Sequence, residues 1–196
     1  MFGLSGRWAA LAWVTLLIGG CTVFPTQPAV DRAWFLLEVP AGPELASSPV
    51  PVELASVRVA PVVAGKGLVY RLGAHRFESD FYNEWFLLPR DHVEHLLRER
   101  WTREHAAVRL VADARGEPDA RQVDVLMTAL HGDLDTEGPG AAVVGMRVFV
   151  QTGDSRQLWE LERRTPIVAR TPEALVAALS SGMGELLLEI EQRLGG

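Results

Sequence analysis

The chain has 196 residues, in which 19 Lys and Arg stand against 25 Asp and Glu, so its formal net charge is −6. This length is typical of one ordinary domain. An acidic domain lacks the basic surface that nucleic acids require, so the composition excludes the usual nucleic-acid-binding classes and predicts no nucleic-acid partner.

The first 20 residues (MFGLSGRWAALAWVTLLIGG) have the layout of a secretory signal peptide. One basic residue, Arg7, precedes an apolar run from Trp8 to Ile18, and two glycines end the run. A membrane-spanning helix needs about 20 apolar residues, and this run is shorter. We therefore predict that residues 1–20 are a lipoprotein signal peptide that is removed.

Cys21 is the only cysteine of the chain, and it directly follows this segment. The order Ile18-Gly19-Gly20-Cys21 resembles the bacterial lipobox, whose cysteine becomes the first residue and is acylated on its sulfur and its amine. Cys21 is therefore the predicted lipidation site, where palmitate or similar acyl chains anchor the protein to a membrane. Because Thr22 follows instead of the Asp that retains enteric lipoproteins in the inner membrane, we expect the periplasmic face of a Gram-negative outer membrane. The alternative is a buried, unmodified cysteine.

Residues 22–32 (TVFPTQPAVDR) contain two prolines and no hydrophobic period. Such a composition is typical of an extended, flexible linker. We expect residues 21–32 to be a lipidated tether and residues 33–196 to be the folded domain.

The first half of the domain is predicted to be rich in β-strands. Strands are expected at residues 34–39, 52–59, 68–72 and 75–80, with a loop at 41–51 and a turn at 65–67. The alternation of the second strand breaks at Ala55 and Ser56, which indicates an irregularity. A helix is expected at 89–103, because Pro89 suits a first helical position and apolar residues recur at three to four residues after it.

The second half is predicted to be a β-meander followed by a helix. Strands are expected at 107–112, 122–134, 141–152 and 157–168, and the Gly/Pro-containing DTEGPG between the second and third indicates a hairpin. Thr171 suits the N-cap of the last helix, with Pro172 at its first position. One apolar stripe along this helix is formed by Leu175, Leu179, Met183, Leu186, Ile190 and Leu194. The order of elements predicts a single mixed α/β domain of the α+β class, with two main helices packed on a largely antiparallel or mixed sheet.

The sequence offers no constellation of residues for catalysis or metal binding. His92 and His95 lie three residues apart on a predicted helix, with His105 beyond it, but no carboxylate or cysteine completes a zinc spacing, and we interpret them as solvated. The segment Asp133–Gly138 imitates the start of an EF-hand loop, but Val144 stands at the twelfth position instead of Glu. With no Gly-x-Ser-x-Gly elbow and no phosphate-binding loop, we predict no enzyme activity, no cofactor and no metal. An enzyme with an unrecognised site is the alternative.

Two surface features point to partners. Five aromatic residues fall within residues 77–86, where a strand is expected to give way to a helix, and Tyr82 and Trp85 are the candidate partner-binding residues. The alternative is that these aromatics fill the corner between the strand and the helix. The last helix also carries a stripe of small residues, Ala177, Ser181 and Gly184, which allows either a homo-oligomer or close packing on its own sheet.

Several short segments together resemble the auxiliary lipoproteins of ABC-type transport systems, the group that includes the paraquat-inducible lipoproteins. They follow the lipobox in this order: WFLLEV, VRVAPV, GLVYRL, Asn83–Trp85, VDVLMTAL and TPEALVAALSSGMGELLLEI. Trp34 and Phe35 stand where that group usually has a tyrosine-rich strand, which marks a divergent branch.

The resemblance implies a non-catalytic lipoprotein that works in lipid transport between the inner and outer membranes. Such lipoproteins accompany an inner-membrane permease and ATPase and a periplasmic MCE-domain protein, and they dock this machinery to the outer membrane. The alternative is an envelope-assembly or cell-wall-binding lipoprotein unrelated to transport.

Overall fold

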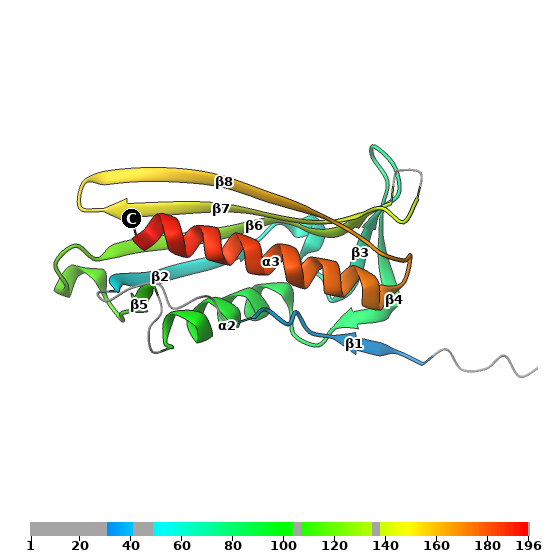
Figure 1. The fold of residues 1–196 in the computed structure, drawn as a ribbon, viewed down its shortest axis with the longest axis horizontal. Coiled ribbons are helices and arrows are strands. Elements are labelled where there is room, and N and C mark those ends of the chain that lie inside the picture. The colour runs from blue at the N-terminus through cyan, green and yellow to red at the C-terminus, as the bar shows by residue number, and fades with distance from the viewer. Residues whose placement is uncertain (1–30, 41–48, 104–106, 135–137, 196) are drawn as a thin grey trace, which may run out of the picture. The chain divides into compact units, whose positions relative to one another are not determined.

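The computed structural model describes residues 31–40, 49–103, 107–134 and 138–195, so the predicted signal peptide, Cys21 and the tether up to residue 30 lie outside the described residues. Residues from Arg32 onward form one unit, in which the described part holds an eight-stranded mixed sheet and two α-helices (Figure 1). The predicted α+β class and single domain are confirmed.

The elements are β1 (Ala33–Phe35), β2 (Val50–Val59), the short 3-10 helix η1 (Pro61–Val63), β3 (Gly67–Arg71), β4 (Phe77–Trp85), α2 (Pro89–Trp101), β5 (Val108–Leu110), the short 3-10 helix η2 (Ala114–Gly116), β6 (Arg121–Asp133), β7 (Ala141–Thr152), β8 (Ser155–Pro166) and α3 (Pro172–Gly195).

The sheet is organised around the long strand β6. Along one edge β6 pairs with β7, and β7 pairs with β8, both antiparallel. Along the other edge the first part of β6 pairs with β2 and its last two residues pair with β3, both parallel. On its other side β2 pairs with β5. Likewise β3 pairs with β4, and β4 pairs with β1. Two small groups of strands therefore share one edge of β6.

Both helices cover the same face of this sheet, as Figure 1 shows. From Met146 onward strand β7 alternates: Met146, Val148 and Val150 are buried toward the helices, while Arg147 and Phe149 are exposed on the other side. We call this other side of the β6–β8 sheet the open face. The two faces follow from the period of two in a strand, which sends successive side chains to opposite sides.

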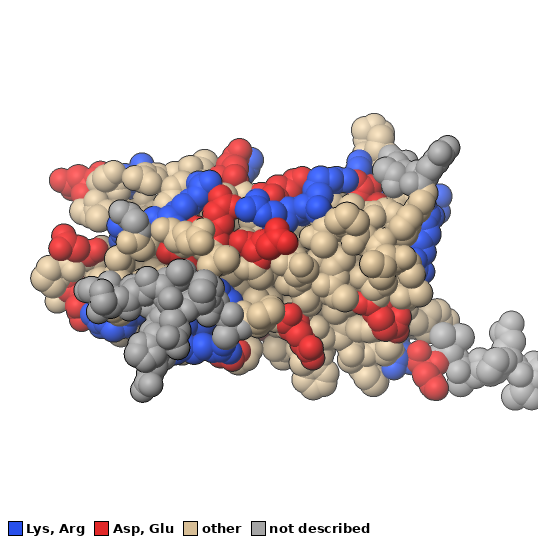
Figure 2. All heavy atoms as spheres, in the orientation of Figure 1, with Lys and Arg blue, Asp and Glu red and all other residues tan. Residues whose placement is uncertain are grey.

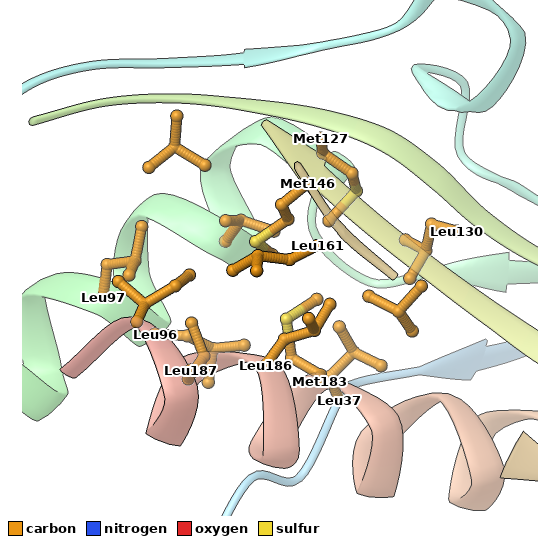
Figure 3. Packing of buried hydrophobic residues seen from close by; sticks show 14 of the residues in the cluster. Leu37, Leu96, Leu97, Met127, Leu130, Met146, Leu161, Met183, Leu186 and Leu187 are labelled. Atoms are coloured by element: carbon orange, nitrogen blue, oxygen red, sulfur yellow. The ribbon is translucent and has the colours of Figure 1, made fainter. Parts of the chain in front are cut away.

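The core lies between the sheet and the two helices. Figure 3 shows Met127, Met146 and Leu161 of the sheet above Leu96 and Leu97 of α2 and above α3. All six apolar residues of the predicted stripe in the last helix are at most 1% exposed, which confirms the stripe: Leu175, Leu179, Met183, Leu186, Ile190 and Leu194. Burial of such side chains is the main stabilising contribution to the fold.

Most elements lie within two residues of their predicted ends, and two differ more. Strand β1 is only three residues long and ends at Phe35, not at the predicted residue 39, and the chain then continues without strand pairing to Pro40. Strand β4 continues to Trp85, so the prediction that it ends at residue 80 is wrong. The irregularity expected at Ala55 and Ser56 is confirmed, because the pairing of β2 with β6 shifts register between Leu54 and Ser56.

Candidate functional site

The two helix histidines that the structure describes have different environments. His92 is 4% exposed, and its Nε2 accepts a hydrogen bond of 3.1 Å from the backbone N–H of Leu37. Burial lowers the pKa of His92 below its usual 6.5. The interpretation of His92 as solvated is therefore wrong, because the first turns of α2 face the segment after β1. His95 is exposed beside Glu99, and His105 lies outside the described residues.

No group of three or more His, Cys, Asp or Glu that could hold a metal ion occurs among the described residues. Asp133 is buried, but it forms ion pairs with Arg71 of β3 and Arg164 of β8. This carboxylate joins three strands at the end of the sheet. Two arginines thus compensate the charge of this buried carboxylate.

Residues 80–83 form a large bulge in β4 with several extra residues, which we call the β4 bulge. Gly67 pairs with Glu84 and Val69 pairs with Ser79. Between these two pairs the chain advances by five residues along β4 but by only two along β3. The Asp80 carboxylate holds the bulge, since it accepts hydrogen bonds of 2.9 and 3.0 Å from the backbone N–H groups of residues 82 and 83. Such a bulge redirects the side chains that it carries.

The β4 bulge presents two aromatic rings to solvent. Phe81 and Tyr82 are 63% and 44% exposed, and their rings meet edge to face with centroids 5.3 Å apart. The guanidinium carbon of Arg32 lies 4.4 Å from the centroid of the Phe81 ring, a cation–π contact. Tyr82, one of the two candidate partner-binding residues, is therefore accessible.

Trp85, the other candidate, is 2% exposed and belongs to the core. Its ring meets that of His92 edge to face at 6.1 Å. Because β4 continues to this residue, Trp85 occupies a strand position that faces α2. The prediction that Trp85 is available to a partner is wrong, and Phe86, the next residue, is the one that is exposed (59%).

A groove of about 750 Å³ lies between α3 and the segment that begins with β1, and we call it the β1–α3 groove. Its lining includes Trp34, Leu36, Phe86, Val176, Ala177 and Ser181. Trp34 and Leu36 are 58% and 45% exposed. The charged residues that line it, Glu38 and Glu173, are both acidic. Figure 2 shows mostly uncharged atoms over the half of α3 that lies nearer to β1 and β4.

Alternation along residues 33–40 explains why apolar side chains remain outside. Leu37 points into the core, while its neighbour Leu36 faces the groove. Beyond β1 the segment is fastened by side chains of the helices: the Leu37 N–H donates to His92, the Glu38 N–H donates to Ser180 Oγ at 3.1 Å, and the Pro40 carbonyl accepts from Arg100. The inner face of the segment is thus fixed, and its apolar outer face stays uncovered.

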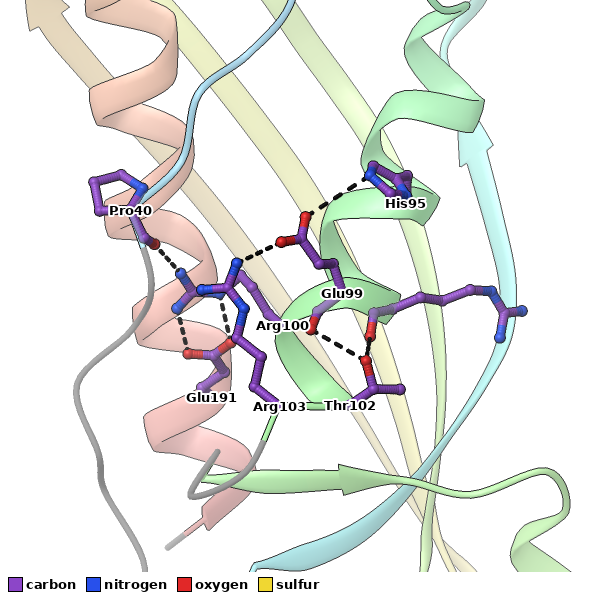
Figure 4. Close-up of polar contacts among 8 residues, drawn as sticks. Pro40, His95, Glu99, Arg100, Thr102, Arg103 and Glu191 are labelled. Atoms are coloured by element: carbon purple, nitrogen blue, oxygen red, sulfur yellow. Dashed lines mark hydrogen bonds and ion pairs between the residues drawn. The ribbon is translucent and has the colours of Figure 1, made fainter.

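A buried ion pair joins the two helices below this segment. Arg100 of α2 donates to both carboxylate oxygens of Glu191 of α3, at 2.7 and 2.5 Å, and it also donates to the carbonyl of Pro40 at 2.6 Å (Figure 4). Both side chains are 5% exposed. A buried pair of charges is tolerated when its geometry is bidentate and its remaining donors are satisfied, as here.

The three small residues of the stripe along the last helix have different surroundings. Ala177 and Ser181 are exposed and line the β1–α3 groove, so they do not pack on the sheet. At Gly184 a Cβ would lie 3.4 Å from Cγ1 of Val39, so this residue is approached by the chain's own segment after β1. The homo-oligomer stays a prediction that concerns Ala177 and Ser181 only.

Sequence reasoning identified Tyr82 and the small residues but did not find the groove itself. The sequence feature that could have indicated an exposed apolar surface is AWFLLEV, residues 33–39. It is apolar at both odd and even positions, so its side chains cannot all be buried in one face of a sheet. No helix in the described part of the chain has the length and hydropathy needed to cross a membrane.

Comparison with solved structures finds the same fold in proteins of low sequence identity. A crystal structure of an uncharacterised protein superposes with a TM-score of 0.67 at 17% identity, over 84% of this chain and 99% of that one. A crystal structure of a protein from Xanthomonas campestris gives a TM-score of 0.66 at 12% identity, over 83% of this chain and 95% of that one. At these identities the likeness shows the fold alone.

A search of curated proteins finds no match to the chain. The family model described as the ABC-type transport auxiliary lipoprotein component matches residues 35–191. This match begins within β1 and ends in the last turns of α3, so it spans the sheet, both helices and both walls of the groove. The chain therefore belongs to the family of ABC-type transport auxiliary lipoprotein components.

Proposed function

We propose that this protein is the outer-membrane-anchored lipoprotein of an MCE-type ABC system that transports lipid between the inner and outer membranes. Family membership makes it an auxiliary component of an ABC transport system, whose partners are membrane transporters. In this role it is non-catalytic and docks the periplasmic MCE-domain protein, with its permease and ATPase, at the outer membrane. The lipobox-like Cys21 and the Thr22 after it support the anchor and its location.

The observation that carries the docking role is the β1–α3 groove. Contiguous exposed apolar surface on a folded domain is typical of a binding site. The groove displays Trp34, Leu36 and Phe86, and aromatic side chains are enriched where proteins meet. Since its charged rim is acidic, the partner that fits it presents apolar side chains beside basic ones.

The groove also lies close to the tether along the chain. Cys21 precedes Ala33 by a stretch that spans roughly 40 Å when fully extended, at about 3.3–3.6 Å per residue. Ala33 pairs with Asn83 of the β4 bulge, so Tyr82 borders the same strand. A partner that reaches the outer membrane would therefore meet the groove and Tyr82 together.

Docking is tested by co-purification of the MCE-domain protein with charge-introducing variants. Trp34→Asp in the groove is expected to lower the recovered partner at least about tenfold and to leave the melting temperature nearly unchanged, because this side chain is exposed. Val62→Asp is the matched control, since Val62 is 49% exposed on η1 and lies outside the groove. Equal recovery with both variants would show that the groove does not dock the partner.

Transport is tested separately by following labelled phospholipid between the two membranes of cells that lack the protein. The proposal expects slower exchange, with rescue by the wild-type chain and not by Trp34→Asp. Unchanged exchange in the deletion strain would favour the alternative, an envelope-assembly or cell-wall-binding lipoprotein unrelated to transport. Family membership as a transport component weighs against that alternative.

A further inference from the structure

A second pocket, of about 530 Å³, lies far from the groove, on the open face of the sheet. It is lined by residues of four strands, β2, β6, β7 and β8, which include Arg58, Gln122, Asp124, Phe149, Gln151 and Arg156. The register shift of β2 turns Ser56 toward Asp124 of β6, and the Ser56 hydroxyl donates a hydrogen bond to that carboxylate. The pocket is therefore part of the rigid sheet and does not depend on loops.

Two arginines of this pocket differ from the other arginines of the open face. Arg147 pairs with Glu160 at 2.8 Å, and Arg164 pairs with the buried Asp133. Among the described residues, by contrast, neither Arg58 nor Arg156 forms an ion pair. Arg156 donates only to the amide oxygen of Gln151, at 3.3 Å. The lining also holds one carboxylate, Asp124, which accepts from Ser56, so the two arginines leave the pocket with one positive charge in excess, which favours an anionic ligand.

The rest of the lining favours a sugar rather than a simple ion. The amide of Gln122 offers donors and an acceptor, which match hydroxyl and acetamido groups. The Gln151 amide donates to the Gly153 carbonyl and accepts from Arg156, and it keeps one further proton and one further lone pair for a ligand. Phe149, which is 38% exposed, lies beside this pair of glutamines, opposite Asp124 of β6 on one side and Leu158 of β8 on the other. A flat aromatic ring packs well against the C–H face of a pyranose. Polar groups converging around one aromatic residue are typical of a small-ligand site.

The surroundings argue against a lipid headgroup. On the open face the pocket borders the exposed Leu158, and the strand positions beyond it carry the charged residues Arg147, Glu160 and Glu162. Acyl chains attached to a bound headgroup would have to cover these charges, which would cost their hydration. A hydrophilic polymer has no such cost.

We propose that this pocket binds an acidic, N-acetylated glycan of the kind that forms the bacterial cell wall. Arg58 and Arg156 hold the carboxylate of the lactyl-bearing sugar, the glutamine amides bind its hydroxyl and acetamido groups, and the ring stacks on Phe149. The proposal concerns a different face from the groove, so it stands or falls independently of the docking role. Together with the proposed outer-membrane anchor, such binding would attach the protein to the cell wall.

The test is isothermal titration of the full chain in detergent with three soluble probes. The disaccharide of N-acetylglucosamine and N-acetylmuramic acid is expected to bind. The neutral disaccharide of N-acetylglucosamine is expected to bind at least about tenfold more weakly, because it lacks the carboxylate. Glycerol 3-phosphate is also expected to bind more weakly than the acidic disaccharide, because it lacks the sugar ring and the acetamido group. Absence of binding by the acidic disaccharide, or equal binding of the two disaccharides, would overturn the proposal. Tighter binding of glycerol 3-phosphate would also overturn it and assign the pocket to a phosphate or headgroup.

Variants assign the binding to this pocket. Arg58→Gln and Phe149→Leu are each expected to weaken binding of the acidic disaccharide about tenfold and to leave the melting temperature within a few degrees. Arg147→Gln removes an arginine of the same face outside the pocket and is expected to keep full affinity. If Arg147→Gln weakens binding as much as Arg58→Gln does, the effect is general surface charge and the assignment of the pocket is wrong.

Discussion

Gly67 allows β3 and β4 to approach closely at the bulge that carries the exposed aromatic residues. A Cβ at this position would collide with the carbonyl oxygen of Asp80 and with Oγ of Ser79, at the start of the β4 bulge. Gly67→Ala is therefore expected to lower the free energy of unfolding by about 1–3 kcal/mol, the usual cost of overpacking, in urea denaturation. Gly65→Ala is the control, because a Cβ there meets nothing within 4 Å. Equal stability of the two variants would contradict the close approach of the strands.

His92 makes the stability of the domain depend on pH. Its lowered pKa means that the folded protein resists the proton that the unfolded chain accepts near pH 6.5. The contribution of neutral His92 is therefore fully present above about pH 7 and is lost as the pH falls through 6.5 toward the lower folded pKa. His92→Gln, whose amide oxygen can also accept from Leu37, is expected to show a smaller loss of unfolding free energy between pH 7 and 5. An unchanged pH profile in the variant would rule out this role.

At the scale of elements, the ion pair between Arg100 and Glu191 joins α2, α3 and the segment after β1. Glu191→Gln leaves a buried guanidinium without its counter-charge, which is expected to cost about 3–5 kcal/mol of unfolding free energy in thermal or urea denaturation. The control is Glu99→Gln, which removes the exposed pairs with His95 and Arg103 and is expected to cost at most about 1 kcal/mol. If the two variants are equally stable, the buried pair does not hold the helices together.

The elements that could be predicted from sequence are those with a long, regular hydrophobic period. Strand β7 and helix α3 each bury one face along their whole length, so their alternation or stripe is visible in the sequence. The end of β4 could not be predicted, because the bulge depends on Gly67 of another strand and on backbone groups that Asp80 binds. The hydrogen bonds of Asp80 are local, but the close approach of Gly67 cannot be read from the sequence of β4.

The groove could not be predicted for a related reason. Its two walls are far apart in the chain: the hydrogen bond from the Glu38 N–H to Ser180 spans 142 residues. Tyr82 was found because a polar-tipped aromatic beside charged residues is a local pattern. Trp34 and Leu36 resemble ordinary strand residues until the position of α3 is known.

For the whole molecule, the predicted anchor and the folded domain are separable. Cys21→Ser is expected to abolish labelling by radioactive palmitate and to leave the unprocessed precursor, because the thiol that receives the lipid is gone. The melting temperature of the domain should not change, since its core is formed by residues from Leu37 to Leu194. Continued labelling of the variant would refute the lipobox assignment.

The way in which residues 33–40 are fastened determines how the domain carries mechanical load. A pull on the chain before Arg32 first reaches the three residue pairs between β1 and β4. Only after these give way does the force reach the bonds at Leu37, Glu38 and Pro40, one after another. The domain therefore releases this segment in steps: β1 leaves the sheet first, and the hydrogen bonds to α2 and α3 break afterwards.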